Sequence, residues 1–354
     1  MDIVKSMYAD TIEERYSLID DDDASGDDSF VDSVISQWMS RNCALRPDDF
    51  ASMLELRGYD KKKYAKCIDG KSFLKGNKGN LSSWYSDFEK IFAFFSNSKF
   101  VEDINVGYVN IFMPFILYAE KTLRTTIPDS QMNSYDNVQN SIRGTLANRL
   151  LNIGLKTLVL EMRRENADGN LQGADGHERM LSFIHMASTY AYQRLLYSRY
   201  PVLARMLTQA TTDYIAFIRE MFTRLEESDS ELKMFLKSTV PLVLSDIRLD
   251  GGDAHNHGRT VAILEFNNGS KVVYKPRDLS IHVLFADLAH ECERSDDFLP
   301  LHVSRVLPED GYAFEEFVRQ SQCLTCDQVS RYYLRIGELL ALVWFLHGLS
   351  LIHI

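Results

Sequence analysis

Apolar residues follow a helical period along most of the chain. Val138, Ile142, Leu146, Leu150 and Ile153 recur every three or four residues, which places them on one face of a helix. Comparable spacing continues to about residue 235. The pattern therefore predicts a mainly helical first region, in which such stripes form the core.

Breaks in this pattern predict where individual helices begin and end. Ala167 to Asn170 contains Asp168-Gly169, which favours the end of the helix that carries the stripe. A further helix is predicted through Met180 to Ala187. Pro201 is expected near the first turn of the next helix, where its missing N–H costs little.

From about Val240 the pattern changes to short β-prone runs. Thr260–Phe266 and Lys271–Tyr274 flank Asn268-Gly269, a strong signal for a tight hairpin. Lys275 then lies at the end of the second strand. Further on, the pattern predicts a helix at residues 284–294 and a last helix at 329–347. Between them it predicts a pair of strands at 301–306 and 313–318, joined by a turn at 308–311. The fold class is therefore α+β, with a mostly helical N-terminal region before a small β-rich lobe.

Charge and cysteine content narrow the functional classes. The 354 residues include 39 basic and 50 acidic side chains, a net charge of −11, which argues against a general nucleic-acid partner. The five scattered cysteines favour reduced thiols and a cytoplasmic location. Cys323 and Cys326 form one C-x-x-C without a second pair at zinc spacing, so no metal ligands are predicted.

Targeting and calcium-binding signals are weak. The first ten residues do not resemble a signal peptide, and the apolar run 111–119 is too short to span a bilayer, so the chain is not expected to be transmembrane. The acidic run 20–28 lacks the spacing of a calcium loop and is interpreted as a solvated loop.

Lys275 is the first candidate functional residue. Kinase-type phosphotransferases hold a phosphate-binding lysine on a strand, so this position suits a nucleotide contact without a Walker loop. The alternative is a surface lysine that extends beside Tyr274. Asp287 and Glu291 on the following helix are candidates for the carboxylate that aligns the lysine, and each is otherwise a solvated helix residue.

The polar loop before the hairpin carries further candidates. Asp253 and His255 lie two residues apart, and such a pair suits phosphate or metal orientation and proton transfer near neutral pH. The alternative is a polar turn before a strand. Arg259 and Arg277 bracket the hairpin and suit phosphate binding, or else form ordinary surface ion pairs. His257 adds an H-x-H pair without a third ligand.

Together these motifs resemble the dehydratase domain of class II lanthipeptide synthetases, the LanM-type enzymes. The pairing of G-D-x-H-x-x-G-R with Y-K-P-R at Gly252–Arg259 and Tyr274–Arg277 carries most of the resemblance. Further similar segments are Thr157–Glu161, Leu171–Gly173 with Glu178-Arg179, Tyr200–Arg205, Gly311-Tyr312 with Glu316–Val318, and Arg335–Gly337. The similarity covers about residues 130–348.

The resemblance implies a domain order. Residues 1–130 are expected to form an N-terminal helical region, and residues 131–235 the helical region of the dehydratase domain. Residues 236–320 then form a kinase-like small lobe, and residues 321–348 begin a helical large lobe.

The resemblance also implies a two-step reaction. The family uses ATP and Mg²⁺ to phosphorylate Ser and Thr of a precursor peptide, then eliminates phosphate to leave dehydroamino acids. Lys275 would contact ATP, with Arg259 and Arg277 as further nucleotide-binding candidates, and Asp253 and His255 match positions needed for dehydration. Zn²⁺ belongs only to a separate C-terminal cyclase domain. The precursor peptide is the expected partner, with membrane-associated export machinery as a further candidate.

The last residues depart from the family pattern. Where the family has a D-x-H-x-x-N catalytic loop, this chain reads Leu349 to Ile354, which resembles a translated transposon end. We therefore expect residues 349–354 to be non-native and the native sequence to stop near Gly348 in this chain. The polypeptide as written is then expected neither to phosphorylate nor to eliminate.

Two other interpretations stay open. The chain is either a module that binds a leader peptide without catalysis, or a kinase-like phosphotransferase with another substrate. Peptide binding that is unaffected by Lys275→Ala, with no ATP binding, would support the first of these. A neighbouring short gene with a C-terminal half rich in Ser, Thr and Cys favours the lanthipeptide assignment over the second.

Overall fold

The computed structural model describes residues 6–19, 27–41, 46–76, 81–97, 104–249, 251, 255–295 and 298–348. Asp253, most of the acidic run 20–28 and the tail 349–354 lie outside these residues. The chain divides into two compact units, Met1–Lys121 with Leu146–Thr212, and Thr122–Thr145 with Asp213–Ile354. Helices and one antiparallel sheet make up the described residues, which confirms the predicted α+β class.

The first unit is helical. Its helices within the described residues are α2 (Ile12–Leu18), α3 (Asp28–Arg41), α4 (Pro47–Arg57), α5 (Lys61–Ile68), α6 (Gly70–Gly76), α7 (Ser83–Ser96), α10 (Gly176–Ser188) and α11 (Tyr190–Arg199). Helix α8 (Met113–Thr126) lies mostly in this unit, and short 3₁₀ turns occupy Met7–Ala9 and Ile104–Phe112.

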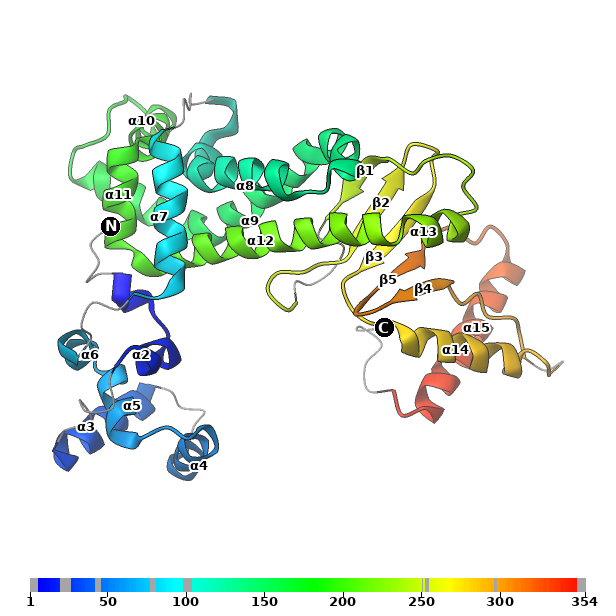
Figure 1. The fold of residues 1–354 in the computed structure, drawn as a ribbon, viewed down its shortest axis with the longest axis horizontal. Helices are drawn as coiled ribbons and strands as arrows, with labels where there is room; N and C mark the ends of the chain where they lie inside the picture. The colour runs from blue at the N-terminus through cyan, green and yellow to red at the C-terminus, as the bar shows by residue number, and fades with distance from the viewer. Residues whose placement is uncertain are drawn as a thin grey trace. The chain divides into compact units, whose positions relative to one another are not determined.

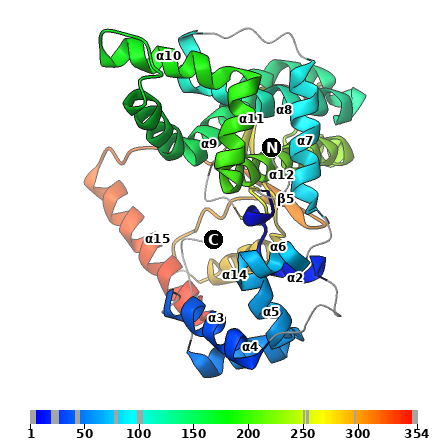
Figure 2. The same ribbon diagram turned by 90° about the vertical axis from the view of Figure 1, so that its left-hand side faces the viewer.

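Aromatic side chains form a core of the first unit. Helices α7 and α11 lie side by side (Figures 1 and 2), and their rings meet where Phe88 and Phe92 contact Tyr197. Phe115 of α8 closes the group, with its ring centroid 5.8 Å from that of Tyr197. All four rings are fully buried, so the cluster removes a large apolar area from contact with water.

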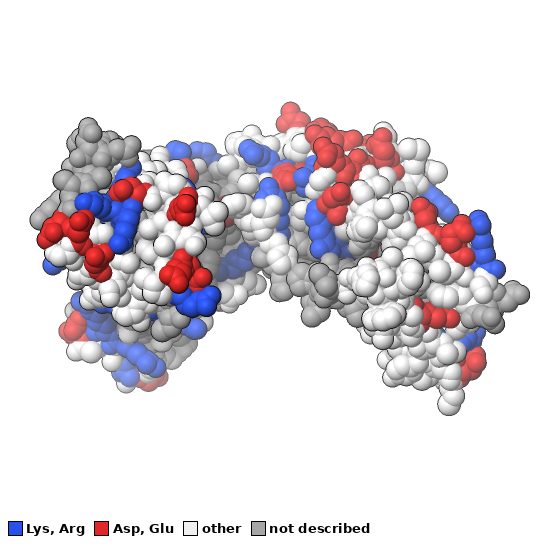
Figure 3. All heavy atoms as spheres, turned by 90° about the horizontal axis from the view of Figure 1, so that it is seen from below, with Lys and Arg blue, Asp and Glu red and all other residues white. Residues whose placement is uncertain are grey.

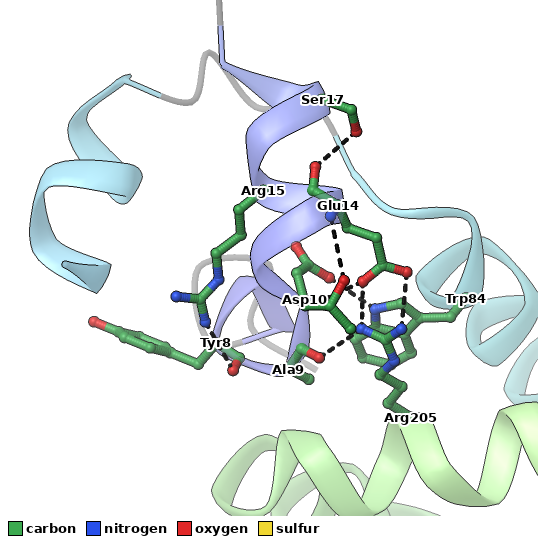
Figure 4. A network of polar contacts seen from close by, with 9 residues as sticks. Tyr8, Ala9, Asp10, Glu14, Arg15, Ser17, Trp84 and Arg205 are labelled. Carbon is green, nitrogen blue, oxygen red and sulfur yellow. Dashed lines mark hydrogen bonds and ion pairs between the residues drawn. The ribbon is translucent and has the colours of Figure 1, made fainter. Parts of the chain in front are cut away.

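A polar network attaches the N-terminal segment to the rest of the first unit (Figure 4). Arg205 donates to the carbonyl of Ala9 at 2.7 Å and pairs with the carboxylate of Glu14. Trp84 donates its indole N–H to Asp10 at 2.9 Å. Burial raises the pKa of the Asp10 carboxyl, and the hydrogen bond from Trp84 opposes this effect. These contacts connect residues 6–19 with α7 and with the start of α12 (Pro201–Glu227).

Two long helices contribute residues to both units, and both lie where the sequence predicted helix. Helix α9 (Met132–Ala167) buries Val138, Ile142, Leu146 and Leu150 and ends where the break was predicted, before Gly169 at φ +75°. Helix α12 (Pro201–Glu227) begins at the proline that the sequence placed in its first turn. None of the described helices combines the length and apolar composition needed to cross a bilayer.

The second unit contains a five-stranded antiparallel sheet in the order β1-β2-β3-β5-β4. Its strands are β1 (Leu244–Arg248), β2 (Ala262–Phe266), β3 (Lys271–Lys275), β4 (Val306–Glu309) and β5 (Tyr312–Glu316). The predicted hairpin is confirmed: Gly269 has φ +79° and donates its N–H to the carbonyl of Phe266 at 2.8 Å. Glycine suits this left-handed position because it has no side chain.

The predicted strand over residues 301–306 is wrong. Strand β4 begins only at Val306 and includes Pro308, which the sequence analysis assigned to a turn. Because β4 is the edge strand of the sheet, a proline without an N–H is tolerated there. The turn is correspondingly shorter and has Gly311 at φ +77°. The predicted helices exist as α14 (Ser280–Cys292) and α15 (Cys326–Phe345), and α13 (Asp229–Phe235) precedes the sheet.

The two faces of the sheet have different environments. One face packs against the second-unit part of α12, where Arg224 donates to the hydroxyl of Tyr274 at 2.7 Å. Ser228, just after α12, shares a 2.8 Å hydrogen bond with Tyr312. Lys275 follows Tyr274 and therefore points to the opposite face. On the molecular face seen in Figure 3, acidic and basic side chains are interspersed, without one continuous basic area.

Candidate functional site

A cavity of about 860 Å³ lies within the second unit, beside the sheet face that carries Lys275. The sheet contributes Lys275 and Glu315, α14 contributes His282 and Phe285, and α15 contributes Arg331 and Arg335 among others. The lining also includes apolar side chains, among them Leu301, Val303, Val318, Ile336 and Leu339, and uncharged polar ones, among them Gln320, Gln322 and Gln328. A concave surface with both kinds of side chain offers a small molecule apolar contacts and hydrogen bonds together.

Lys275 and Glu315 form an ion pair at the wall of this cavity. Their side chains are only 13% and 14% exposed. The other oxygen of Glu315 accepts a hydrogen bond from the hydroxyl of Ser304. Burial raises the pKa of Glu315, but the hydrogen bonds from Lys275 and Ser304 outweigh it, and the net pKa lies below its ordinary value. Glu315 is therefore ionised at neutral pH.

The remaining charged groups make the cavity positive. Arg335 donates to the carbonyl of Pro300 at 2.9 Å, and Arg331 pairs with Asp327 at 2.7 Å. Burial lowers the pKa of His282, and the positive charge of Lys275 lowers it further, so the imidazole is neutral at pH 7. The cationic side chains suit an anionic ligand, and the apolar lining suits a flat ring system.

Of the described residues that the sequence predicted for the site, Lys275 is the one that lines this cavity. Arg259 instead binds Glu220 of α12 through two of its nitrogens, at 2.6 and 2.9 Å. Its third contact is with the carbonyl of Asn256 at 2.9 Å. Arg277 is exposed and lies outside the cavity lining. Asp253 falls outside the described residues, so its predicted role stays a prediction.

His255 begins a tight turn in the connection between β1 and β2. Its backbone exchanges two 2.9 Å hydrogen bonds with Arg259. Between them Asn256, His257 and Gly258 all have positive φ, at 41°, 64° and 76°. Positive φ strains the backbone of the two non-glycine residues, and such strain is commonly found at functional loops. His255 is exposed on this turn, away from the lining of the cavity.

The sequence pattern did not indicate the carboxylate that pairs with Lys275. It placed this role on α14, yet Asp287 and Glu291 are exposed there, and Glu291 pairs with Arg294 at 3.0 Å. The partner Glu315 lies on β5, next to β3 in the sheet. Glu315 and Glu316 are consecutive, so their side chains point to opposite faces of the sheet. Glu316 shares the face of the buried Phe314, and Glu315 shares the face of Lys275.

No cluster of three or more potential metal ligands occurs among the residues that the structure describes. Cys323 and Cys326 are both free and exposed, and Cys323 lies at the cavity lining. The described residues that line the cavity include cationic, uncharged polar and apolar side chains.

A family model described as a domain of unknown function (DUF4135) matches residues 200–353. The matched segment runs from the start of α12 to the end of α15, so it includes the sheet, the turn at His255 and the whole lining of the cavity. No curated protein matches the chain.

Proposed function

We propose that the second unit is the nucleotide-binding lobe of a peptide Ser/Thr dehydratase related to class II lanthipeptide synthetases. The observation that carries this proposal is the position of Lys275, at the end of the third strand of an antiparallel sheet and at the wall of a large cavity. Protein kinases hold their phosphate-binding lysine on the third strand, before a helix. Here α14 follows β3 in the same order.

The cavity residues fit ATP as a ligand. The ammonium of Lys275 suits the phosphates, and Phe285, Val303 and Val318 suit the base. When bound, ATP would supply the phosphoryl group, while this chain's residues bind and orient it. The described residues hold no cluster suited to Mg²⁺, so we assign no residue to a metal.

The peptide substrate rests on the family resemblance. The family described as DUF4135 is associated with LanM-type synthetases, and the matched segment contains both the loop at Gly252–Arg259 and the Y-K-P-R motif. On this proposal His255 and Asp253 belong to the dehydration chemistry, and the precursor peptide is the partner. The chain is proposed to act in the cytoplasm.

Nucleotide binding is tested by titrating the full chain with ATP in the presence of Mg²⁺ by calorimetry. Lys275→Ala should weaken ATP binding about tenfold or more, because a charge-assisted contact to phosphate is lost. Lys271→Ala is the matched control, because Lys271 lies on the same strand and pairs with Glu265 at 2.6 Å, outside the cavity. The control should bind ATP as the unmodified protein does. Equal affinities in both variants would contradict the proposal.

Peptide binding separates the remaining alternatives. A fluorescent precursor peptide encoded beside this gene should bind the chain, and a scrambled peptide should not. Peptide binding without ATP binding would favour a binding module without catalysis. ATP binding without peptide binding would favour a kinase-like phosphotransferase with another substrate.

A further inference from the structure

The pair between Lys275 and Glu315 is built within one sheet. Strands β3 and β5 are antiparallel neighbours, with Val273 opposite Glu315 and Lys275 opposite Ala313. Lys275 and Glu315 are therefore diagonal neighbours on the same face. The hydrogen bonds of the ladder hold both backbones in place, so the carboxylate has a fixed position relative to the lysine.

Both oxygens of the Glu315 carboxylate are occupied. One pairs with Lys275 and the other accepts from Ser304, which precedes β4. The burial of this side chain makes its geometry less variable than that of a surface pair. Lys275 has three N–H donors, and the ion pair leaves donor capacity for a ligand in the cavity.

Helix α14 presents a different group to this pair. His282 lines the same cavity and interacts electrostatically with both Lys275 and Glu315. In protein kinases a glutamate on the helix after the third strand aligns the lysine, and movement of that helix makes or breaks the pair. Here the helix supplies an imidazole, and the sheet supplies the carboxylate.

We infer that Glu315 is the positioning residue for Lys275, and that it replaces the helical glutamate of protein kinases with a carboxylate on β5. Because both partners belong to one sheet, the lysine is aligned whatever the position of α14. This inference rests on the proposed function, since it requires Lys275 to bind phosphate.

The test compares ATP with adenosine, which has no phosphate. Glu315→Gln should weaken ATP binding about fivefold or more, because the lysine loses the partner that holds it toward the phosphates. Adenosine binding should stay unchanged. Glu316→Gln is the matched control: the next residue on β5 pairs with Arg305 at 3.2 Å and lies outside the cavity lining. This control variant should bind both ATP and adenosine with the affinity of the unmodified protein.

A double variant tests the exchange of position directly. Glu315→Gln combined with His282→Glu moves the carboxylate from the sheet to α14, as in protein kinases. We expect this variant to regain most of the lost ATP affinity. A folded double variant that regains none would overturn the inference, because a carboxylate beside Lys275 would then not be what ATP binding requires.

The remaining outcomes also decide the question. Tighter ATP binding by Glu315→Gln would show that Glu315 competes with phosphate for the lysine, and would overturn its positioning role. Equal weakening of ATP and adenosine would indicate a purely structural role and would overturn it as well. Weaker ATP binding in Lys275→Ala but not in Glu315→Gln defeats this inference alone. An unmodified protein that binds no ATP defeats the proposed function.

Discussion

Glu161 in the first unit and Glu315 in the second are both shielded carboxylates that pair with a cationic side chain, yet their surroundings differ. Glu161 is fully buried and accepts a hydrogen bond from Tyr200 at 2.8 Å, in addition to its pair with Arg199. The hydroxyl of Tyr192 lies 3.1 Å from Glu161 but is nearer to Glu165. Glu315 lies at a cavity wall with Lys275.

The two pairs differ in what surrounds their charges. Around Glu161 the protein itself supplies a donor to each carboxylate oxygen, which buried charge requires. Neighbouring Glu165 is similarly satisfied, by Tyr192 at 2.7 Å and Asn170 at 2.6 Å. Around Lys275 one side is open to a volume large enough for a ligand. Burial of a charge alone therefore does not point to a binding site, and the adjoining cavity is the feature on which the proposed role of Lys275 rests.

The largest expected effect is the loss of stability when the hydrogen-bond network around Glu161 is broken. Glu161→Ala removes the acceptor of Tyr200 and the nearer partner of Arg199, which keeps only Glu165 at 3.5 Å, and should lower the free energy of unfolding by about 3 kcal/mol. Urea denaturation followed by circular dichroism measures it. Asp87→Ala, which breaks an exposed pair with Lys90, is the control and should cost at most about 1 kcal/mol. Similar losses of stability in both variants would contradict the structural importance of the buried Glu161 network.

Alkaline pH should act on the buried tyrosines of both units. Burial raises the pKa of Tyr192, and its hydrogen bond to Glu165 adds to this effect. Burial raises the pKa of Tyr274 to about 12, although Arg224 opposes the rise. The folded state therefore keeps protons that the unfolded chain loses, so this stability is complete below about pH 10 and declines above it.

The expected decline for each such tyrosine is about 0.7 kcal/mol per pH unit at pH 10 and approaches about 1.4 kcal/mol per pH unit above it. Urea unfolding between pH 9 and pH 11 measures the slope. Tyr192→Phe removes one of the titrating groups and should make the slope shallower. An identical slope in the variant would contradict the assignment of this effect to Tyr192.

The smallest effect is expected at Arg259. This variant tests whether the second unit also contains an ion pair that serves stability and not ligand binding. Arg259 and Glu220 are about one quarter exposed, so Arg259→Ala should cost only about 1 kcal/mol of stability. ATP affinity should stay within about twofold of the unmodified protein, because the guanidinium is occupied by Glu220 and Asn256. A tenfold loss of ATP affinity would instead restore the phosphate-binding role predicted from the sequence.

The candidate site could be predicted only in part. Lys275 was identified because an Asn-Gly turn and two β-prone runs are local signals, readable within fifteen residues of the lysine. Glu315 was missed because it lies forty residues further on and joins the site through strand pairing. The helix between them offered Asp287 and Glu291 as nearer candidates, and both are exposed.

Local patterning determined the elements of this protein. The stripe on α9, the proline at the start of α12 and the β2–β3 hairpin all follow from side-chain period and backbone preference over short stretches of chain. Only the tertiary structure decided which charges meet. It paired Arg259 with Glu220 and left Lys275 beside Glu315 at a cavity, because partners distant in sequence are chosen by strand order and helix packing, which short-range patterns do not encode.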